Sequence, residues 1–210
     1  MEEIESEITL PELPQDTRAF AALADLLGLR LQPQGMTTTF DRMVDTYDMA
    51  LLSKDHSLRV RQKLDNMYAG NEIRLTYKFP LREHERLFIR REKKLTVEQA
   101  DYDKVLDLLS SLVAGVTDDP LSAILHVNEL AREAYIGEEG ARLSLSLDHC
   151  SYSLPDNEES ARDEYVFEIE THGLPEDAVL QAADWVLENL GGREAKQHKY
   201  ARGMRLVGNL

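Results

Sequence analysis

The sequence has little that would cross-link the chain or carry it into a membrane. Its single cysteine, Cys150, excludes an internal disulfide and a zinc cluster built on several cysteines. No apolar run approaches the roughly 20 residues of a membrane span, and no secretory signal precedes the first predicted strand. We therefore expect a cytoplasmic protein that crosses no membrane.

Positive charge is also scarce. The chain has 24 basic and 39 acidic residues, which gives a formal net charge of −15. Nucleic acids and anionic membranes both require a basic footprint, so neither is an expected partner. The apolar fraction of 42% over 210 residues is enough for a core and predicts a single domain, residues 1–210. The composition indicates no particular oligomeric state.

Most of the chain alternates between polar and apolar residues with the period of a β-strand. The predicted strands are 3–10, 36–49, 57–63, 71–79, 86–95, 124–135, 141–153 and 164–171. Helical patterns occupy 16–29, 96–113 and 175–192, and the acidic stretch 154–164 is predicted to be a hairpin loop. Many strands in succession with few crossover helices indicate an α+β fold built on an antiparallel sheet or barrel.

The first predicted strand places three carboxylates on one face. Glu3, Glu5 and Glu7 alternate with apolar or small residues in the sequence EEIESEITL. Carboxylates that lie this close repel one another unless a cation neutralises them. Two explanations are open from this strand alone, a solvated outer face on an acidic protein or a metal site.

The polar faces of the other strands are sorted by charge. Glu168 and Glu170 share a face of the eighth predicted strand, whereas Arg59 and Arg61 share a face of the third. On a single strand such a face would usually meet solvent. If a closed sheet turned these faces inward, the basic side would suit phosphoryl oxygens and the acidic side would suit Mg²⁺ or Mn²⁺. Together they predict a site for a metal–polyphosphate complex.

Eight short motifs, in order along nearly the whole chain, carry a resemblance to a known family. They are EIESE, DTYDMALLSKDHSLRVR, LTYKFP, RRE, LAREAY, LSLDHCSY, FEIETHG and QHKYARG. In this order they resemble the motifs of the CYTH superfamily, the triphosphate tunnel metalloenzymes. The first resembles the ExExK strand of that family, and FEIETHG resembles its ExE strand.

The resemblance implies an eight-stranded antiparallel β-barrel, open as a tunnel and flanked by helices. It also implies a divalent metal, Mg²⁺ or Mn²⁺, and a small-molecule triphosphate or polyphosphate as substrate. Inorganic tripolyphosphate is the leading substrate, because no pocket for reading a base is evident in the sequence. The alternatives are an adenylate cyclase, a thiamine triphosphatase or a polyphosphate-binding protein without catalysis.

Site residues follow from the motifs by resemblance. The implied metal ligands are Glu3, Glu5, Glu168 and Glu170. The implied phosphate-binding residues are Arg59, Arg61, Lys78, Arg90, Arg132 and Lys199. Glu7, Glu92 and Asp148 are the implied catalytic residues of the tunnel.

The chain departs from the family pattern at the lysine of ExExK. Glu7 holds that position in one register and Thr9 in the other, and both registers put the key residues on the same face. We prefer the first register, because an apolar residue, Ile8, then follows the motif. In some hydrolytic members that lysine is assigned a part in activating water, so its loss predicts slower chemistry or another base. His198 lies near the predicted tunnel mouth, but no histidine is expected to bind metal.

Overall fold

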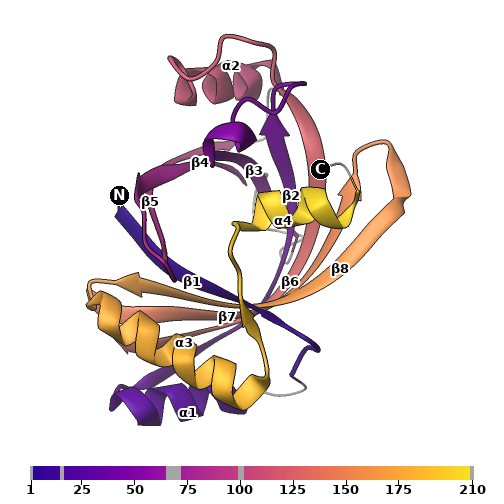
Figure 1. Ribbon diagram of the computed structural model, residues 1–210. Helices are drawn as coiled ribbons and strands as arrows, with labels where there is room; N and C mark the ends of the chain where they lie inside the picture. The colour runs from indigo at the N-terminus through magenta and orange to yellow at the C-terminus, as the bar shows by residue number, and fades with distance from the viewer. Residues whose placement is uncertain (1, 15–16, 65–71, 99–101, 209–210) are drawn as a thin grey trace.

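The computed structural model describes residues 2–14, 17–64, 72–98 and 102–208. Within these ranges eight strands form a closed antiparallel barrel (Figure 1). They are β1 (Glu2–Leu10), β2 (Leu31–Asp45), β3 (Ser57–Lys63), β4 (Glu72–Arg82), β5 (Phe88–Glu98), β6 (Ser122–Glu138), β7 (Ala141–Leu154) and β8 (Asn157–His172). None of the described helices is both long and apolar enough to cross a membrane.

The barrel closes at β1, the strand that carries the three glutamates. Around the barrel the strands run β5-β4-β3-β2-β6-β7-β8-β1, and β1 then pairs with β5. Glu5 lies opposite Glu170 of β8 on one side and Phe88 of β5 on the other. A two-residue strand, β9 (Arg193–Glu194), adds to the end of β1. This closed antiparallel barrel with flanking helices confirms the predicted fold class.

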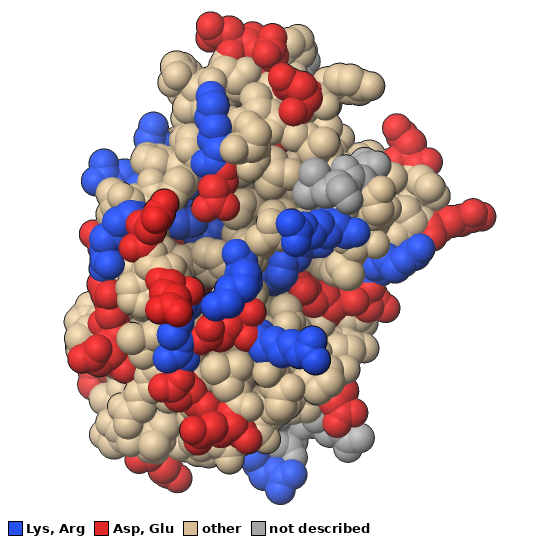
Figure 2. Space-filling model, viewed as in Figure 1, with Lys and Arg blue, Asp and Glu red and all other residues tan. Residues whose placement is uncertain are grey.

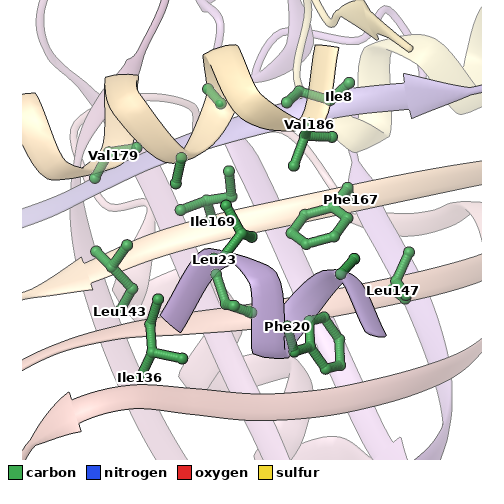
Figure 3. Close-up of a cluster of buried hydrophobic side chains, with 14 of the residues drawn as sticks. Ile8, Phe20, Leu23, Ile136, Leu143, Leu147, Phe167, Ile169, Val179 and Val186 are labelled. Carbon is green, nitrogen blue, oxygen red and sulfur yellow. The ribbon is translucent and has the colours of Figure 1, made fainter. Parts of the chain in front are cut away.

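Two helices, α1 (Arg18–Leu27) and α3 (Glu176–Leu190), cover the outer face of one half of the barrel. Figure 3 shows their apolar side chains packed against those of β6, β7 and β8, for example Phe20 against Phe167. Burying an apolar side chain of this size contributes about 1.5–3 kcal/mol. Because the leucines and isoleucines of these strands face the helices, the alternate polar residues are turned into the barrel.

A third helix, α2 (Tyr102–Leu112), covers the outer face of β3 and β4. Leu58 of β3 and Leu75 of β4 pack with Leu109 of this helix. The alternate residues of the same strands, including Arg59 and Arg61, therefore face the interior.

The fourth helix, α4 (Lys199–Leu206), was not predicted from the sequence. Its Tyr200 and Met204 pack on inward-facing residues of β6 and β7, among them Leu125 and Tyr152. In Figure 1, α4 lies in front of the upper half of the barrel, in yellow. The helix is short and contains Gly203, a poor helix former, which explains why its pattern was not recognised.

Gly203 lets α4 approach the barrel closely. A Cβ atom at this position would lie 2.5 Å from Cδ1 of Tyr152 and 2.6 Å from Cδ2 of Leu125. We expect Gly203→Ala to lower the free energy of unfolding by about 1–3 kcal/mol through overpacking, as measured by urea denaturation. Arg205→Ala, on the exposed face of the same helix, serves as the control. Equal stability of Gly203→Ala and wild type would contradict the close packing of α4.

Two predicted boundaries were wrong for identifiable reasons. The strand predicted at 36–49 ends at Asp45, whose carboxylate accepts hydrogen bonds from the backbone N–H groups of Thr46, Leu51 and Leu52 and so fixes a turn. The loop predicted at 154–164 is mostly strand, because β7 and β8 are joined by a turn between Leu154 and Asn157. The predicted segments 16–29, 71–79 and 96–113 include residues that lie outside the described ranges.

Candidate active site

The inward faces of the strands enclose a central cavity of about 190 Å³. Its charged lining comes from each of the eight barrel strands and from α4: Glu5, Glu7, Asp41, Arg59, Arg61, Arg74, Lys78, Arg90, Lys94, Glu129, Glu133, Asp148, Glu168, Glu170 and Lys199. On the outer face seen in Figure 2, basic and acidic side chains are interspersed. The cavity therefore concentrates charges of both signs in a small, partly enclosed volume.

The predicted metal ligands lie together on β1 and β8. Glu5 is directly opposite Glu170 in the ladder, and Glu7 is directly opposite Glu168. Glu3 lies on the same inward face of β1 and is buried. The apolar face of β1 packs against the outer core instead, so a solvated outer face is the wrong explanation for this strand.

Burial makes ionisation of Glu3 and Glu170 costly. Burial and the nearby Glu3 carboxylate raise the pKa of Glu170 to about 8. Burial likewise raises the pKa of Glu3, whose buried Oε2 has no hydrogen-bond partner among the described residues. Carboxylate oxygens are the ligands that Mg²⁺ and Mn²⁺ prefer, and a divalent cation would remove the repulsion. The residues present therefore fit the implied metal.

The strands opposite and beside the acidic cluster carry the cations. Lys78 Nζ lies 2.5 Å from Glu3 Oε1 and 3.3 Å from Glu5 Oε2. Arg90 Nη2 lies 2.5 Å from Glu5 Oε1. Burial opposes the charge on Lys78, but the two glutamates overcome it and raise the pKa of the ammonium group. Both cations are thus held charged at the edge of the acidic cluster.

Arg61 is fixed by carboxylates that the sequence analysis did not single out. Its guanidinium donates to both oxygens of Asp41 at 2.7 Å and to Glu129 at 2.8 Å. Arg59 is held more loosely, with Nη1 3.4 Å from Asp41, and its buried Nε has no hydrogen-bond partner among the described residues. A bidentate arrangement of this kind orients the arginine fork before an anion arrives.

Lys199, at the start of α4, joins the remaining carboxylates. Its Nζ lies 2.6 Å from Glu129, 2.6 Å from Glu168 and 3.2 Å from Asp148. Burial and the Glu168 charge hold the pKa of Asp148 well above its usual range. Glu129 and Asp148 also form, with Cys150, a cluster whose ligand atoms lie within 4.8 Å of one another. The ammonium group of Lys199 already contacts both carboxylates, so the positive charge in this cluster is supplied by the lysine.

Arg132 does not lie where the resemblance implied. It occupies the outer face of β6, and its Nη1 donates to the backbone oxygen of Pro14 at 2.9 Å. The residues of β6 that line the cavity are Glu129 and Glu133. Alternation could not reveal this, because the inner face of β6 is apolar where it packs on α4, as at Val127, and acidic further along.

Glu92 and Glu7 both face inward but are already paired. Glu92 is buried and forms an ion pair with Lys94 two residues along β5. Glu7, at the position of the missing lysine, pairs with Arg202 of α4, which the sequence analysis missed because it predicted no helix there. Arg202 Nε also lies 3.0 Å from Glu164 of β8. The Glu7 carboxylate is therefore paired with a cation of the C-terminal helix.

No family model and no curated protein matches the chain. Its fold is similar to that of a candidate adenylyl cyclase from Hippeastrum described as having a dominant triphosphatase activity, at 18% identity and a TM-score of 0.60, covering 97% of this chain and 95% of that one. It is also similar to a candidate adenylate cyclase from Bacillus halodurans, at 20% identity and a TM-score of 0.56, covering 96% of this chain and 97% of that one. A protein from Pyrococcus horikoshii is similar at 21% identity and a TM-score of 0.57, covering 95% of this chain and 96% of that one. The shared architecture is the triphosphate tunnel fold.

Proposed function

We propose that this protein is a metal-dependent hydrolase of triphosphates, with inorganic tripolyphosphate as the leading substrate. The observation that supports this is the pairing, inside one closed barrel, of a four-glutamate cluster on β1 and β8 with cations from β3, β4, β5 and α4. Acidic and basic side chains that line one cavity suit a metal bound to a polyphosphate.

In this proposal Glu3, Glu5, Glu168 and Glu170 hold Mg²⁺ or Mn²⁺, which when bound neutralises phosphoryl charge. The phosphate-binding residues are Arg59, Arg61, Lys78, Arg90 and Lys199. Their donors stabilise the charge that develops on the oxygens as water attacks the terminal phosphoryl group in line. Each except Arg59 already contacts a carboxylate within 3 Å, so the substrate must replace some of these contacts.

The same contacts favour a second candidate, a polyphosphate-binding protein without turnover. Lys199 alone contacts three carboxylates, and the family lysine is absent at Glu7. An adenylate cyclase is a third candidate, because two of the similar structures carry that description. A thiamine triphosphatase is the fourth, from the same resemblance.

One assay separates the four candidates. Tripolyphosphate, thiamine triphosphate and ATP are offered with Mg²⁺ or Mn²⁺, and phosphate, cyclic AMP and bound ligand are measured. Phosphate release that is fastest from tripolyphosphate supports the proposal, whereas fastest release from thiamine triphosphate favours the thiamine compound as substrate. Cyclic AMP from ATP indicates a cyclase, and binding of tripolyphosphate without turnover indicates a binding protein.

The cavity arginines give a matched mutational test. We expect Arg59→Ala to weaken tripolyphosphate binding ten- to a hundredfold, because a charge-assisted hydrogen bond contributes about 1.5–3 kcal/mol. The measurement is calorimetric titration in the presence of Mn²⁺. Arg132→Ala removes the same type of side chain from the outer face and should bind like wild type. If both variants bind equally well, Arg59 does not contact the substrate.

A further inference from the structure

His198 is the one histidine of the six in the sequence that lines the central cavity. It is the N-cap residue of α4, directly before Lys199, and its side chain is 2% exposed. His198 thus lines the same cavity as Lys199, whose ammonium group contacts Asp148 and Glu168. Sequence spacing alone gave this histidine no role.

A carboxylate outside the cavity lies close to the ring. His198 Nε2 lies 3.3 Å from Oδ1 of Asp55, whose side chain is largely exposed. Asp55 follows the short 3₁₀ helix Leu52–Lys54 with φ 60°, and its backbone N–H donates to Leu52 O at 3.0 Å. A non-glycine residue in this left-handed region needs local support, and these contacts provide it.

The buried nitrogen of the ring is not used in a hydrogen bond. Nε2 of His198 has no hydrogen-bond partner among the described residues, and one nitrogen of a neutral imidazole accepts a proton. Burial lowers the pKa of His198, the charges of Arg90 on β5 and Arg202 on α4 act in the same direction, and Asp55 opposes them. The ring is therefore neutral near pH 7 and able to take up a proton.

The other candidate bases of the cavity are engaged. Glu7 pairs with Arg202, Glu92 pairs with Lys94, and Asp148 contacts Lys199 at 3.2 Å. A carboxylate whose oxygens already bind an ammonium or guanidinium group has fewer lone pairs free for a water proton than a neutral imidazole without such a partner. His198 is therefore the cavity residue best suited to act as the base that activates water, since the lysine of ExExK is absent.

We propose that His198, with the Asp55 carboxylate close to its ring, accepts the proton of the water molecule that attacks the terminal phosphoryl group. The inference rests on the proposed hydrolytic function. The water oxygen forms a bond to the terminal phosphorus, and the bridging P–O bond breaks with its electron pair on the departing diphosphate. The water proton passes to the imidazole ring of His198 and is then released to product or solvent.

The test is the pH dependence of tripolyphosphate hydrolysis by wild type, His198→Gln and Asp55→Asn, with Mn²⁺ present. We expect His198→Gln to lower kcat about 10²- to 10⁴-fold, to keep its calorimetric affinity for tripolyphosphate, and to lose the acid limb of the kcat profile. Asp55→Asn should move that limb to lower pH, since it removes the charge that raises the pKa of His198. If His198 and Asp55 had only structural roles, neither substitution would move the acid limb of the kcat profile.

His56→Gln is the matched control, because this ring bonds to Tyr77 OH at 2.8 Å and does not line the cavity. If wild type hydrolyses none of the triphosphates, the proposed function and this inference both fall. If wild type is active and His198→Gln keeps its kcat and acid limb, the inference alone is overturned. If His198→Gln fails to fold, an unshifted limb in Asp55→Asn overturns it.

Discussion

Replacing Arg202 with methionine is expected to destabilise the protein by about 3–5 kcal/mol. The guanidinium is mostly buried, pairs with Glu7 of β1 and lies 3.0 Å from Glu164 of β8, so its loss leaves two poorly solvated carboxylates without their cation. Urea denaturation at pH 7 measures the effect. An effect of this size would show that α4 is tied to the barrel by charge as well as by Tyr200 and Met204.

A double-mutant cycle separates the ion pair from packing. Glu7→Gln combined with Arg202→Met should lose less stability than the sum of the single variants, because neither charge is then left alone. Arg205→Met, on the exposed face of α4, should change stability by no more than about 0.5 kcal/mol. Strict additivity of the two single effects would contradict a direct interaction between Glu7 and Arg202.

The ion pair between Glu7 and Arg202 changes the result expected from Glu7→Lys, the substitution that would complete the ExExK pattern that β1 resembles. A lysine at position 7 would point at Arg202, so Glu7→Lys would bury two like charges together instead of simply restoring the family pattern. In this chain the carboxylate on β1 and the arginine on α4 belong together. A substitution that restores the lysine therefore requires a change at Arg202 as well.

Strand period and charge sorting predicted an antiparallel sheet or barrel, and the resemblance to the tunnel family implied the closed barrel with a polar interior. Each of β1, β3 and β8 carries like charges on one face and apolar residues on the other, and the three predicted helices supply apolar surface to cover the second face. Once that surface is covered, the charged faces can only turn inward. The inward placement of Glu5, Arg61 and Glu170 follows from this geometry.

Three features depend on contacts that no single segment reveals. The register of β6, and with it the placement of Arg132, is set by packing against α4, a helix too short and glycine-containing to be recognised. Asp41 holds Arg61 from a neighbouring strand, in a segment whose polar and apolar residues do not alternate cleanly. The partner of Glu7 lies 195 residues further along the chain. Local periodicity carries no information about such pairs.

The stability of the metal-free protein is expected to fall as the pH rises from about 5 to 8. Glu170 titrates at about 8 in the folded protein against 4.5 for an ordinary glutamate, because burial and Glu3 disfavour its charge. Between these values the folded state keeps a proton that the unfolded chain has lost, so each such group lowers stability by up to about 1.4 kcal/mol per pH unit. Urea denaturation at pH 5, 6, 7 and 8 in chelator measures the slope.

Mn²⁺ should counteract the loss of stability at rising pH, and it should stabilise the protein more at pH 8 than at pH 6. A metal ion must displace the proton of Glu170, so its affinity should rise between pH 6 and 8, and binding should release protons. Titration calorimetry in two buffers of different ionisation enthalpy counts these protons. Glu170→Gln should flatten the stability slope, weaken Mn²⁺ binding and release fewer protons, whereas Glu138→Gln, exposed at the end of β6, should behave like wild type.

The contribution of Glu170 to the stability slope and its part in Mn²⁺ binding arise from one carboxylate opposite Glu5, so these two quantities must change together. A Glu170→Gln variant with the wild-type stability slope would show that this carboxyl group is ionised at neutral pH. A variant with a flattened slope and unchanged Mn²⁺ affinity would show that the group is protonated but is not a ligand. The joint loss is expected only if the acidic cluster keeps its proton until a divalent cation takes its place.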